Sequence, residues 1–500
     1  MSPAELNVVV FGATAVLLLG VAAVRVSTSA GLPSLLLYLA IGLAIGEAGL
    51  GLSFDQAALT QTLGTLALAV ILAEGGLTTR FSVIRPVIGL AGVLATVGVA
   101  VSVTITSALA LLLLDVDART AVLLGAVVSS TDAAAVFAVM RTLPLRGRTR
   151  AILEAESGFN DPPVIILVSL VVSDMWHDLD PLAAFLGFLQ QMLVGVAVGL
   201  AVAYAGRWVL RNLALPATGL YPLATMAFAL LGFGAAGVVG GSPFVAVYAA
   251  GLMLGNADLP HHNAMLGFAE GLAWLSQIGL FVMLGLLASP ARLVDAILPA
   301  LVVGATLTLI ARPISVLLCA TPFGVRLREQ VFISWAGLRG AVPIVLATFP
   351  IIAGLPNAER IFDVTLLLVV VFTLLQGPTL PWLSTRLGVV EPTHTRELTF
   401  EHSPFEDLGA TMLTFDIPPG SRLNGVALAE LRLPGDTVVA LILRDGALFV
   451  PRADTTLRTR DHLLLAATVE HRAAVERRLR AVSRAGRLAT WLGERGQAST

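Results

Sequence analysis

The stretch that decides the fold class reads AILEAESGFNDPPVIILVSLVVS, from Ala151 to Ser173. It is long enough to cross a bilayer, for which about 20 predominantly apolar residues suffice, yet it carries Glu154, Glu156 and Asp161. A charged side chain at the centre of a membrane helix costs about 2.5–3.5 kcal/mol, so such residues usually line a pathway or pair with one another. The stretch therefore predicts a membrane helix that carries a polar site.

The composition of the whole chain agrees with a membrane protein. Of its 500 residues, 56% are hydrophobic and 13% are charged, against about 25% charged residues in soluble domains. The mean hydropathy is +0.88. A soluble core cannot bury that much apolar surface, whereas lipid can cover it. The net charge of −2 gives no reason to expect a nucleic-acid partner.

Apolar runs of membrane-spanning length recur along residues 1–390 and predict an all-α polytopic membrane domain of about 13 transmembrane helices. The count is fixed only to within one helix, because Gly240, Gly241 and Pro243 separate two short runs. The runs lie near residues 6–25, 32–50, 57–77, 84–113, 118–141, 150–174, 183–213, 219–239, 242–257, 264–288, 294–320, 328–354 and 361–386.

Loop arginines indicate the orientation of these helices. If the N-terminus lies outside, the inside loops hold eleven arginines and the outside loops hold only Arg119, Arg292 and Arg360. Cytoplasmic loops of membrane proteins are enriched in basic residues. We therefore expect a multi-pass protein of the cell inner (cytoplasmic) membrane, with the N-terminus outside and the C-terminus in the cytoplasm.

After Glu391 the chain changes to short strand-like runs separated by turns. Thr411–Ile417, Thr437–Leu443 and His462–Ala467 are expected strands, and Ala427–Leu431 is an expected helical turn. We predict a linker over residues 391–402 and a small cytoplasmic α/β domain over 403–470. An arginine-rich helix and tail follow over 471–500.

Polar side chains cluster on two faces of the predicted helix at 150–174. Ser157 and Asp161 are four residues apart and share one face, and Glu156 and Asn160 form a second pair beside them. Hydroxyl, amide and carboxylate oxygens are hard ligands, for which alkali cations and protons compete. The alternative is that this stretch ends a loop, in which Glu154 and Glu156 are simply solvated.

A second polar stretch, Ser129-Ser130-Thr131-Asp132, falls in the middle of the run 118–141. Such residues compete for their own backbone, so we expect an interrupted helix whose second half is capped by Asp132. Interrupted helices form ion sites in transporters. A continuous helix with hydroxyls bonded to the preceding turn is the alternative.

Arg339 lies deep in the apolar run 328–354, within the sequence WAGLRGAVP. A buried arginine needs a carboxylate or a helix C-terminus nearby; we choose Glu156, with Asp132 as the second candidate. A side chain reaching to the membrane interface is the alternative. Glu74 is either a carboxylate at a funnel or an interfacial one, and Arg312 has no assigned partner.

These motifs together resemble the monovalent cation/proton antiporter family, in its NhaP-type, electroneutral branch, over residues 1–390. The resemblance rests on three segments: Ser130-Thr131-Asp132, Glu156-Ser157-Gly-Phe-Asn160-Asp161-Pro and Gly337-Leu338-Arg339-Gly340-Ala341. Residues 403–470 look like a TrkA-C (RCK-C) regulatory domain, through Leu433-Pro-Gly-Asp436 and Arg444-Asp-Gly446.

The family resemblance implies a homodimer with inverted repeats and two broken helices that cross at the ion site, near Thr131 and near 336–340. It implies that Asp161 binds the cation or the proton, with Thr131 and Ser157 as further ligands and Asn160 supporting the site. The other implied roles are ion binding by Asp132, a place near the entrance for Glu74, and a buried ion pair of Glu156 with Arg339.

The function expected from this resemblance is exchange of K⁺, or Na⁺, for H⁺ without a cofactor. If only the cation-bound and the protonated form of Asp161 cross, exchange is electroneutral. The TrkA-C-like domain favours K⁺ and suggests a small regulatory ligand, such as a nucleotide, at residues 403–470. A ligand-gated cation channel is the rival class, but the sequence lacks a TVGYG-type filter. The sequence also lacks the HExxH and GxSxG motifs of hydrolases, so we do not expect an enzyme.

Overall fold

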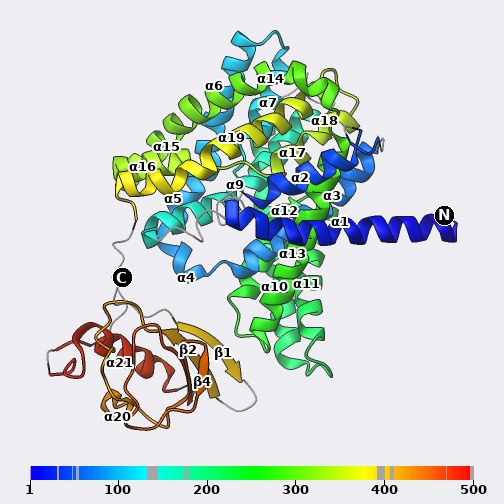
Figure 1. The fold of residues 1–500 in the computed structure, drawn as a ribbon. Coiled ribbons are helices and arrows are strands. Elements are labelled where there is room, and N and C mark those ends of the chain that lie inside the picture. The colour runs from blue at the N-terminus through cyan, green and yellow to red at the C-terminus, as the bar shows by residue number, and fades with distance from the viewer. Residues whose placement is uncertain are drawn as a thin grey trace. The chain divides into compact units, whose positions relative to one another are not determined.

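The structure is a computed structural model of the chain (Figure 1). It forms two compact units, Met1–Glu391 and Pro392–Thr500, which we call unit 1 and unit 2. The structure describes residues 2–30, 33–47, 49–51, 56–131, 145–173, 176, 180–390, 400–405, 410–468, 470–491 and 493–495.

Unit 1 is a bundle of helices, given next for the part of the chain that the structure describes. Its helices are α1 (Pro3–Ala30), α2 (Ser34–Ile45), α3 (Ala57–Thr78), α4 (Phe81–Ile84), α5 (Ile88–Val93), α6 (Val99–Leu113), α7 (Ala118–Ser129), α9 (Gly147–Val172), α10 (Pro181–Asn212), α11 (Leu220–Val238), α12 (Pro243–Gly255), α13 (His262–Leu287), α14 (Pro290–Ala305), α15 (Arg312–Ala320), α16 (Leu327–Trp335), α17 (Ala341–Leu346), α18 (Thr348–Ile352) and α19 (Ala358–Leu387).

Within the described residues, 9 helical stretches are long and apolar enough to cross a membrane. Shorter apolar helices occupy four of the other predicted runs, at Ser34–Ile45, Ala118–Ser129, Pro243–Gly255 and Ala341–Ile352. The polytopic helical fold is therefore confirmed. The count of thirteen membrane crossings stays a prediction.

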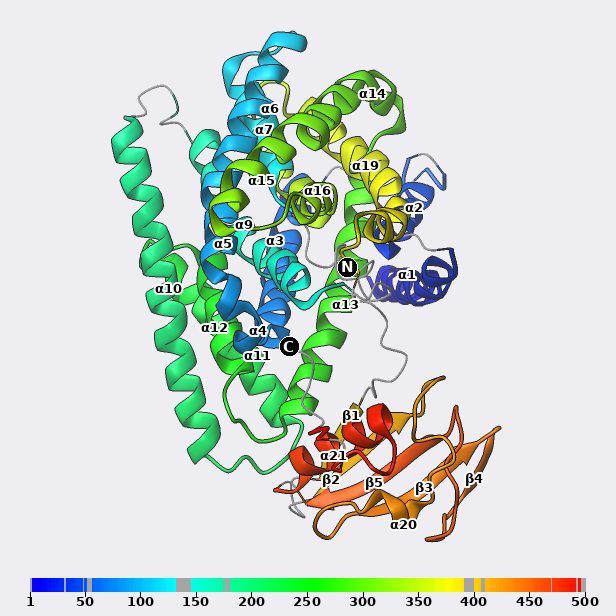
Figure 2. The same ribbon diagram turned by 90° about the vertical axis from the view of Figure 1, so that its left-hand side faces the viewer.

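The helices differ greatly in how much of their surface the bundle covers. Only 6% of the most apolar window of α1 and 11% of that of α10 are buried, against 72% for α9. Figure 1 shows α1 extending beyond the other helices of unit 1, and Figure 2 shows α10 at the edge of the bundle. Leucine, valine and phenylalanine side chains on such outer helices suit lipid. The charged helix α9 lies at the centre, where other helices shield it from lipid.

Small residues allow α3 and α12 to approach closely. A Cβ atom added to Gly251 in α12 would lie 2.6 Å from the carbonyl oxygen of Ala73 in α3, and one added to Gly76 would lie 2.6 Å from the carbonyl oxygen of Tyr248. Neither helix backbone could stay in place with a larger side chain at these contacts. Close packing of this kind holds helices together in lipid, where the hydrophobic effect between them is absent.

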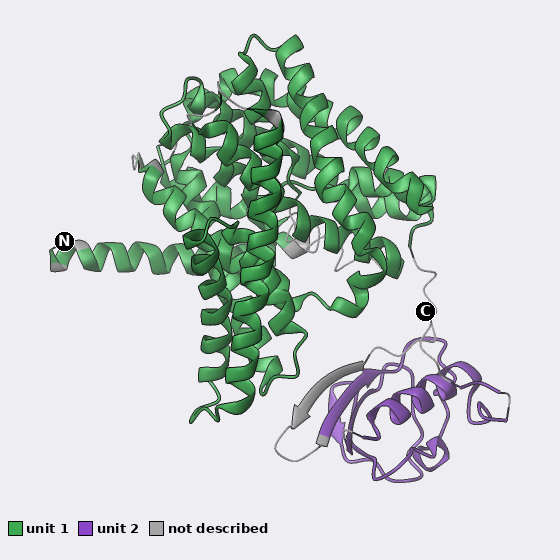
Figure 3. Ribbon diagram, turned by 180° about the vertical axis from the view of Figure 1, so that it is seen from behind, with its two compact units in different colours: residues 1–391 green, residues 392–500 purple. Residues whose placement is uncertain are grey.

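Unit 2 is a five-stranded antiparallel sheet with one face covered by a helix (Figure 3). The strand order is β1-β2-β5-β3-β4. The core lies between α21 and one face of β2, β3 and β5, and includes Leu413, Leu465 and Leu479. The elements are β1 (Phe400–Phe405), β2 (Ala410–Asp416), α20 (Leu428–Leu431), β3 (Val438–Arg444), β4 (Ala447–Phe449), β5 (His462–Thr468) and α21 (Arg472–Ala485).

The predicted strands at 411–417, 437–443 and 462–467 and the helical turn at 427–431 are present in this unit. The structure adds β4 and also β1, which begins inside the segment 391–402 that we expected to be a linker. Neither β1 nor β4 shows a long alternation of apolar and polar residues in its sequence. Each is defined by its pairing, β1 with β2 and β4 with β3.

Candidate ion-binding site

Two helices of unit 1 end where interruptions were expected, one at the polar stretch 129–132 and one at the segment 336–340 that the family resemblance implies. Helix α7 ends at Ser129, and Ser130 has an extended backbone with ψ of 142°. Helix α16 ends at Trp335, and α17 begins only at Ala341. Asp132, expected to cap the second half of its helix, lies outside the described residues.

Helix α9 supplies the carboxylate of the site and continues through Pro162 and Pro163. A proline lacks the backbone N–H that would bond to the carbonyl four residues earlier. The carbonyl groups of Gly158 and Phe159 are therefore without their usual helical donors. This part of α9 offers backbone oxygens as well as side-chain oxygens.

Side chains from the end of α7 contact the polar face of α9. The Ser130 hydroxyl donates to Oδ1 of Asp161, and Nδ2 of Asn160 donates to the Thr131 hydroxyl. The Thr131 hydroxyl in turn lies 3.5 Å from Oγ of Ser157. The structure thus brings together the predicted ligands Thr131, Ser157, Asn160 and Asp161.

This cluster is almost fully buried, since Asp161 is 4% exposed and Asn160 is 0% exposed. Oδ1 of Asn160 has no hydrogen-bond partner among the described residues. Leaving a buried acceptor unpaired costs about 1–3 kcal/mol, and a bound cation would remove that cost. The orphan oxygen belongs to the residue before Asp161, and both residues contact the same short segment after α7, Asn160 through Thr131 and Asp161 through Ser130.

The buried ion pair of α9 is made with a different arginine from the one predicted. Glu156 accepts two hydrogen bonds from Arg312, at 2.5 Å from Nη1 and 2.8 Å from Nη2. The side chains are 2% and 5% exposed. The structure therefore replaces Arg339 by Arg312 as the ion-pair partner of Glu156.

Local backbone geometry explains this correction. Arg312 follows a π-helical turn at Thr306–Ala311, a feature that is frequent at functional sites. Its guanidinium group lies against Gly337, where an added Cβ atom would be 2.9 Å from Nε of Arg312. Only glycine in the unwound segment leaves room for this approach.

Arg339 lies in the same unwound segment and is 3% exposed. Its carbonyl oxygen accepts a hydrogen bond of 3.1 Å from Thr373 in α19. Among the described residues, Nε and Nη1 of Arg339 have no hydrogen-bond partner. Arg339 is thus a second buried cation of this region. It does not make the two parallel hydrogen bonds that Arg312 makes to Glu156.

The structure also adds residues that the sequence did not assign to the site. Ser130 belonged to the recognised motif but was not predicted to bind Asp161. Tyr248 of α12 packs its ring against Phe159, with the centroids 5.8 Å apart, and covers Gly158. No local pattern marks this tyrosine. Glu74 is half-buried in α3, and its role near an entrance stays a prediction.

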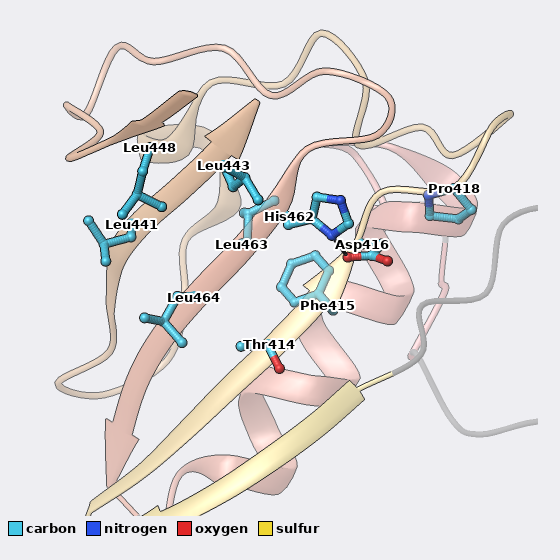
Figure 4. A pocket seen from close by; sticks show the side chains of 10 residues that line it. All are labelled: Thr414, Phe415, Asp416, Pro418, Leu441, Leu443, Leu448, His462, Leu463 and Leu464. Atoms are coloured by element: carbon cyan, nitrogen blue, oxygen red, sulfur yellow. Dashed lines mark ion pairs between the residues drawn. The ribbon is translucent and has the colours of Figure 1, made fainter. Parts of the chain in front are cut away.

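Unit 2 contains an open groove with a volume of about 560 Å³ on the face of the sheet opposite its core (Figure 4). Leucines are half of its lining residues, and His462 and Asp416 form an ion pair at one end when the histidine is protonated. No arginine is among its lining residues. A phosphate group would find only His462 as a cation there, so this groove adds no support to the predicted nucleotide.

The fold and the site together define a secondary transporter, because such proteins carry ions on interrupted helices in the middle of a helical bundle. The family described as sodium/hydrogen exchanger, transmembrane, matches residues 14–386, and the TrkA-C domain matches residues 412–480. The chain therefore belongs to the sodium/hydrogen exchanger family and carries a TrkA-C domain. It is a membrane antiporter that exchanges a cation for a proton.

Relatives of known name cover most of the chain. It is 36% identical to the K(+)/H(+) antiporter NhaP2 of Shewanella baltica over 445 residues, which are 87% of this chain and 77% of the relative. It is 35% identical to the K(+)/H(+) antiporter NhaP of Alkalimonas amylolytica over 474 residues, which are 93% of this chain and 82% of the relative.

A solved structure has the same fold. The sodium proton antiporter MjNhaP1 from Methanocaldococcus jannaschii aligns with a TM-score of 0.68 and 23% identity, over 77% of this chain and 100% of that chain. At this identity the likeness supports the helical architecture and carries no conclusion on which cation is bound.

Proposed function

We propose that this antiporter exchanges K⁺ for H⁺ at the cluster of Ser130, Thr131, Ser157, Asn160 and Asp161. The observation that carries the proposal is a buried carboxylate next to an amide oxygen that lacks a hydrogen-bond partner among the described residues. Hydroxyl, amide and carboxylate oxygens are the ligands that hard cations prefer. The names of the two relatives at 35% and 36% identity favour K⁺ over Na⁺.

Coupling follows from competition for one carboxylate. When Asp161 is charged, it attracts the cation, and the hydroxyls of Thr131 and Ser157 and the amide oxygen of Asn160 complete the shell. When Asp161 is protonated, the site is neutral and holds no cation. If only these two forms change their access from one side to the other, one cation moves for each proton and no net charge crosses.

The charged side chains next to the site form an ion pair with each other. Glu156 and Arg312 neutralise each other, so they tie α9 to α15 without offering a free carboxylate for a second ion. Asn160 is neutral, so Asp161 is the only carboxylate among these five ligands. This arrangement supports electroneutral exchange.

The remaining parts of the proposal concern assembly and regulation. The protein acts as a homodimer in the inner membrane, with its N-terminus outside and its C-terminus in the cytoplasm. Unit 2 sets how often the carrier turns over, and residues 403–470 bind the regulatory ligand. None of the residues proposed to bind the cation belongs to unit 2.

Two other functions are distinguishable from this one. Na⁺/H⁺ exchange would use the same site, and a relative named Na(+)/H(+) antiporter 1 is 27% identical over 368 residues. A ligand-gated cation channel would need a continuous path of water, whereas Asp161 is 4% exposed. The low exposure favours a carrier.

The test is a cation series with the purified protein in liposomes that carry a pH gradient and a pH-sensitive dye. We expect K⁺ to collapse the gradient at least about tenfold faster than Na⁺ at equal concentration, which corresponds to about 1.4 kcal/mol of discrimination. The rate should not change with an imposed membrane potential. An equal or faster rate with Na⁺ would show that K⁺ is not the preferred substrate. A cation current without proton movement would identify a channel.

A further inference from the structure

The C-terminal end of unit 2 presents large apolar side chains to solvent. Trp491 is 88% exposed and Leu488 is 59% exposed. Between them, Ala489 is fully buried. Ala489 is thus buried in the domain, while the side chains of Leu488 and Trp491 are exposed.

Polar contacts hold this segment in place. Arg478 donates from Nη1 to the Thr490 hydroxyl at 2.8 Å, and Arg487 pairs with Glu430 at 2.9 Å. The backbone N–H of Glu494 donates to the carbonyl of Ala489 at 2.9 Å, which closes the turn around Trp491. The outward position of the tryptophan is therefore fixed by the fold of unit 2.

The C-terminal segment that contains the exposed tryptophan has more arginines than glutamates, although Arg480, Arg484 and Arg487 each pair with a glutamate. Residues 471–500 contain seven arginines and two glutamates. Arg477, Arg480 and Arg484 share one face of α21 by their helical spacing, opposite the face that enters the core. Arg484 lies 3.8 Å from Glu494, so this basic face adjoins the turn. We call Arg477, Arg480, Arg484, Arg487, Leu488 and Trp491 the basic tryptophan surface.

This combination matches the chemistry of a membrane surface. Tryptophan is enriched at the level of lipid headgroups, because its ring is apolar and its N–H is polar. Clusters of arginine next to apolar side chains bind anionic headgroups. A basic surface without the aromatic and aliphatic side chains would suit other polyanions, but Leu488 and Trp491 need an apolar layer.

The chain itself keeps unit 2 near a bilayer. Helix α19 ends at Leu387 and β1 begins at Phe400, and an extended chain spans at most about 3.6 Å per residue. The link is thus shorter than about 47 Å. A tether of this length gives a high effective concentration of the domain at the lipid surface. We propose that unit 2 docks on anionic lipid through the basic tryptophan surface.

The proposal can be tested on the full-length protein in lipid nanodiscs. Cys319 is the only cysteine and is buried, so it can be replaced by alanine and a single cysteine introduced as Trp491→Cys. Val450→Cys is the matched control, because Val450 is an apolar residue of unit 2 with 74% exposure. Each cysteine is labelled with an environment-sensitive fluorophore. Discs of phosphatidylcholine alone are compared with discs of equal parts phosphatidylcholine and phosphatidylglycerol.

We expect the label at position 491 to shift to the blue and become several-fold less accessible to acrylamide only in the phosphatidylglycerol discs. The label at 450 should stay aqueous in both. Raising the salt from about 0.1 M to about 1 M, which shortens the Debye length from about 10 Å to about 3 Å, should reverse the shift. Replacing Arg477, Arg480 and Arg484 together by glutamine should weaken it.

Hydrogen exchange of residues 486–495 in the unmodified protein provides a measurement that needs no substitution. Slower exchange in phosphatidylglycerol discs than in phosphatidylcholine discs supports docking. Equal exposure of the 491 label and equal exchange in both discs would overturn the proposal. Protection that is the same in both lipids and depends on protein concentration would identify a second copy of the chain as the partner and would overturn it too.

Discussion

Each unit of this antiporter holds an arginine in a two-point contact with a carboxylate, but in different surroundings. In unit 1, the side chains of Arg312 and Glu156 are 5% and 2% exposed. In unit 2, Arg444 donates to both oxygens of Asp461 at 2.8 Å and 2.7 Å, and the side chains are 19% and 1% exposed.

The difference between the two pairs lies in what replaces a lost partner. Water can reach the Arg444 side, and the Asp461 carboxylate also accepts from the backbone N–H of Arg458 at 2.7 Å. Among the described residues, neither water nor a backbone N–H relieves Glu156 in this way, and its helix has the most buried window of the nine membrane-length stretches. On α9, the buried Glu156 carboxylate is thus neutralised by an arginine, whereas the Asp161 carboxylate accepts from a neutral hydroxyl, that of Ser130.

The largest effect is expected at Asp161. Asp161→Asn removes the only carboxylate proposed to bind both ions, so exchange should fall by more than about tenfold while the protein stays folded. Dye-reported exchange in liposomes measures this, and about 1.4 kcal/mol corresponds to each factor of ten. Asp258→Asn, an equivalent change at an exposed residue, is the control and should leave exchange unchanged. Residual activity of Asp161→Asn above a tenth of the wild type would contradict the assignment.

Breaking the buried pair should have the next largest effect. Glu156→Gln and Arg312→Gln should each lower the free energy of unfolding by about 3–5 kcal/mol, because the partner is left charged and unpaired in a dry environment. The double variant should lose less than the sum. Arg444→Gln should cost less, because Asp461 keeps its hydrogen bond from the backbone N–H of Arg458. Thermal unfolding in detergent measures all four.

The same cycle distinguishes the two arginines near Glu156. We expect strong coupling of Glu156 with Arg312 and weaker coupling with Arg339, which shares no hydrogen bond with it among the described residues. Additive effects of Glu156→Gln and Arg312→Gln, together with strong coupling to Arg339→Gln, would restore the pair expected from the sequence.

Helix packing gives a smaller and more local effect. Gly251→Ala places a methyl group 2.6 Å from a carbonyl oxygen of α3, and overpacking of this kind costs about 1–3 kcal/mol. Gly234→Ala, at a position of α11 with no neighbour within 4 Å of the new Cβ, should cost almost nothing. Equal melting temperatures of the two variants would show that α3 and α12 do not pack this closely.

The smallest effect on transport is expected from removing unit 2. Truncation after Val390 should leave exchange and the preference between K⁺ and Na⁺ unchanged, because all proposed ligands lie in unit 1. Its pH threshold or ligand response should change. The oligomeric state must be measured alongside, and a truncated dimer without any exchange would show that unit 2 is part of the transport machinery.

The sequence predicted the features that depend on neighbours along the chain. Apolar runs located the helices, and the polar stretch at 129–132 located the end of α7, whereas the break at 336–340 was expected from the family resemblance. The spacing of Ser157, Asn160 and Asp161 placed them together on α9. These features follow from helical periodicity and from the cost of charge in lipid.

The features that the sequence missed depend on packing between distant segments. Arg312 and Arg339 both lie in apolar runs, and nothing along the chain shows which one reaches Glu156. The choice depends on the π-helical turn before Arg312 and on the space at Gly337. In the sequence, Tyr248 is one residue of an apolar run. Only the packing of α12 on α9 places it at the site. The short edge strands β1 and β4 are likewise defined only by their partners.

The most direct test of competition at Asp161 is proton release on cation binding, measured with purified, weakly buffered protein in detergent. Linkage requires that a cation displacing a proton from one carboxylate releases it to solution. We predict that K⁺ releases close to one proton per chain from the wild-type protein at a pH where Asp161 is protonated, and none from Asp161→Asn. Equal release from both proteins, or K⁺ binding without release from the wild type, would contradict the account.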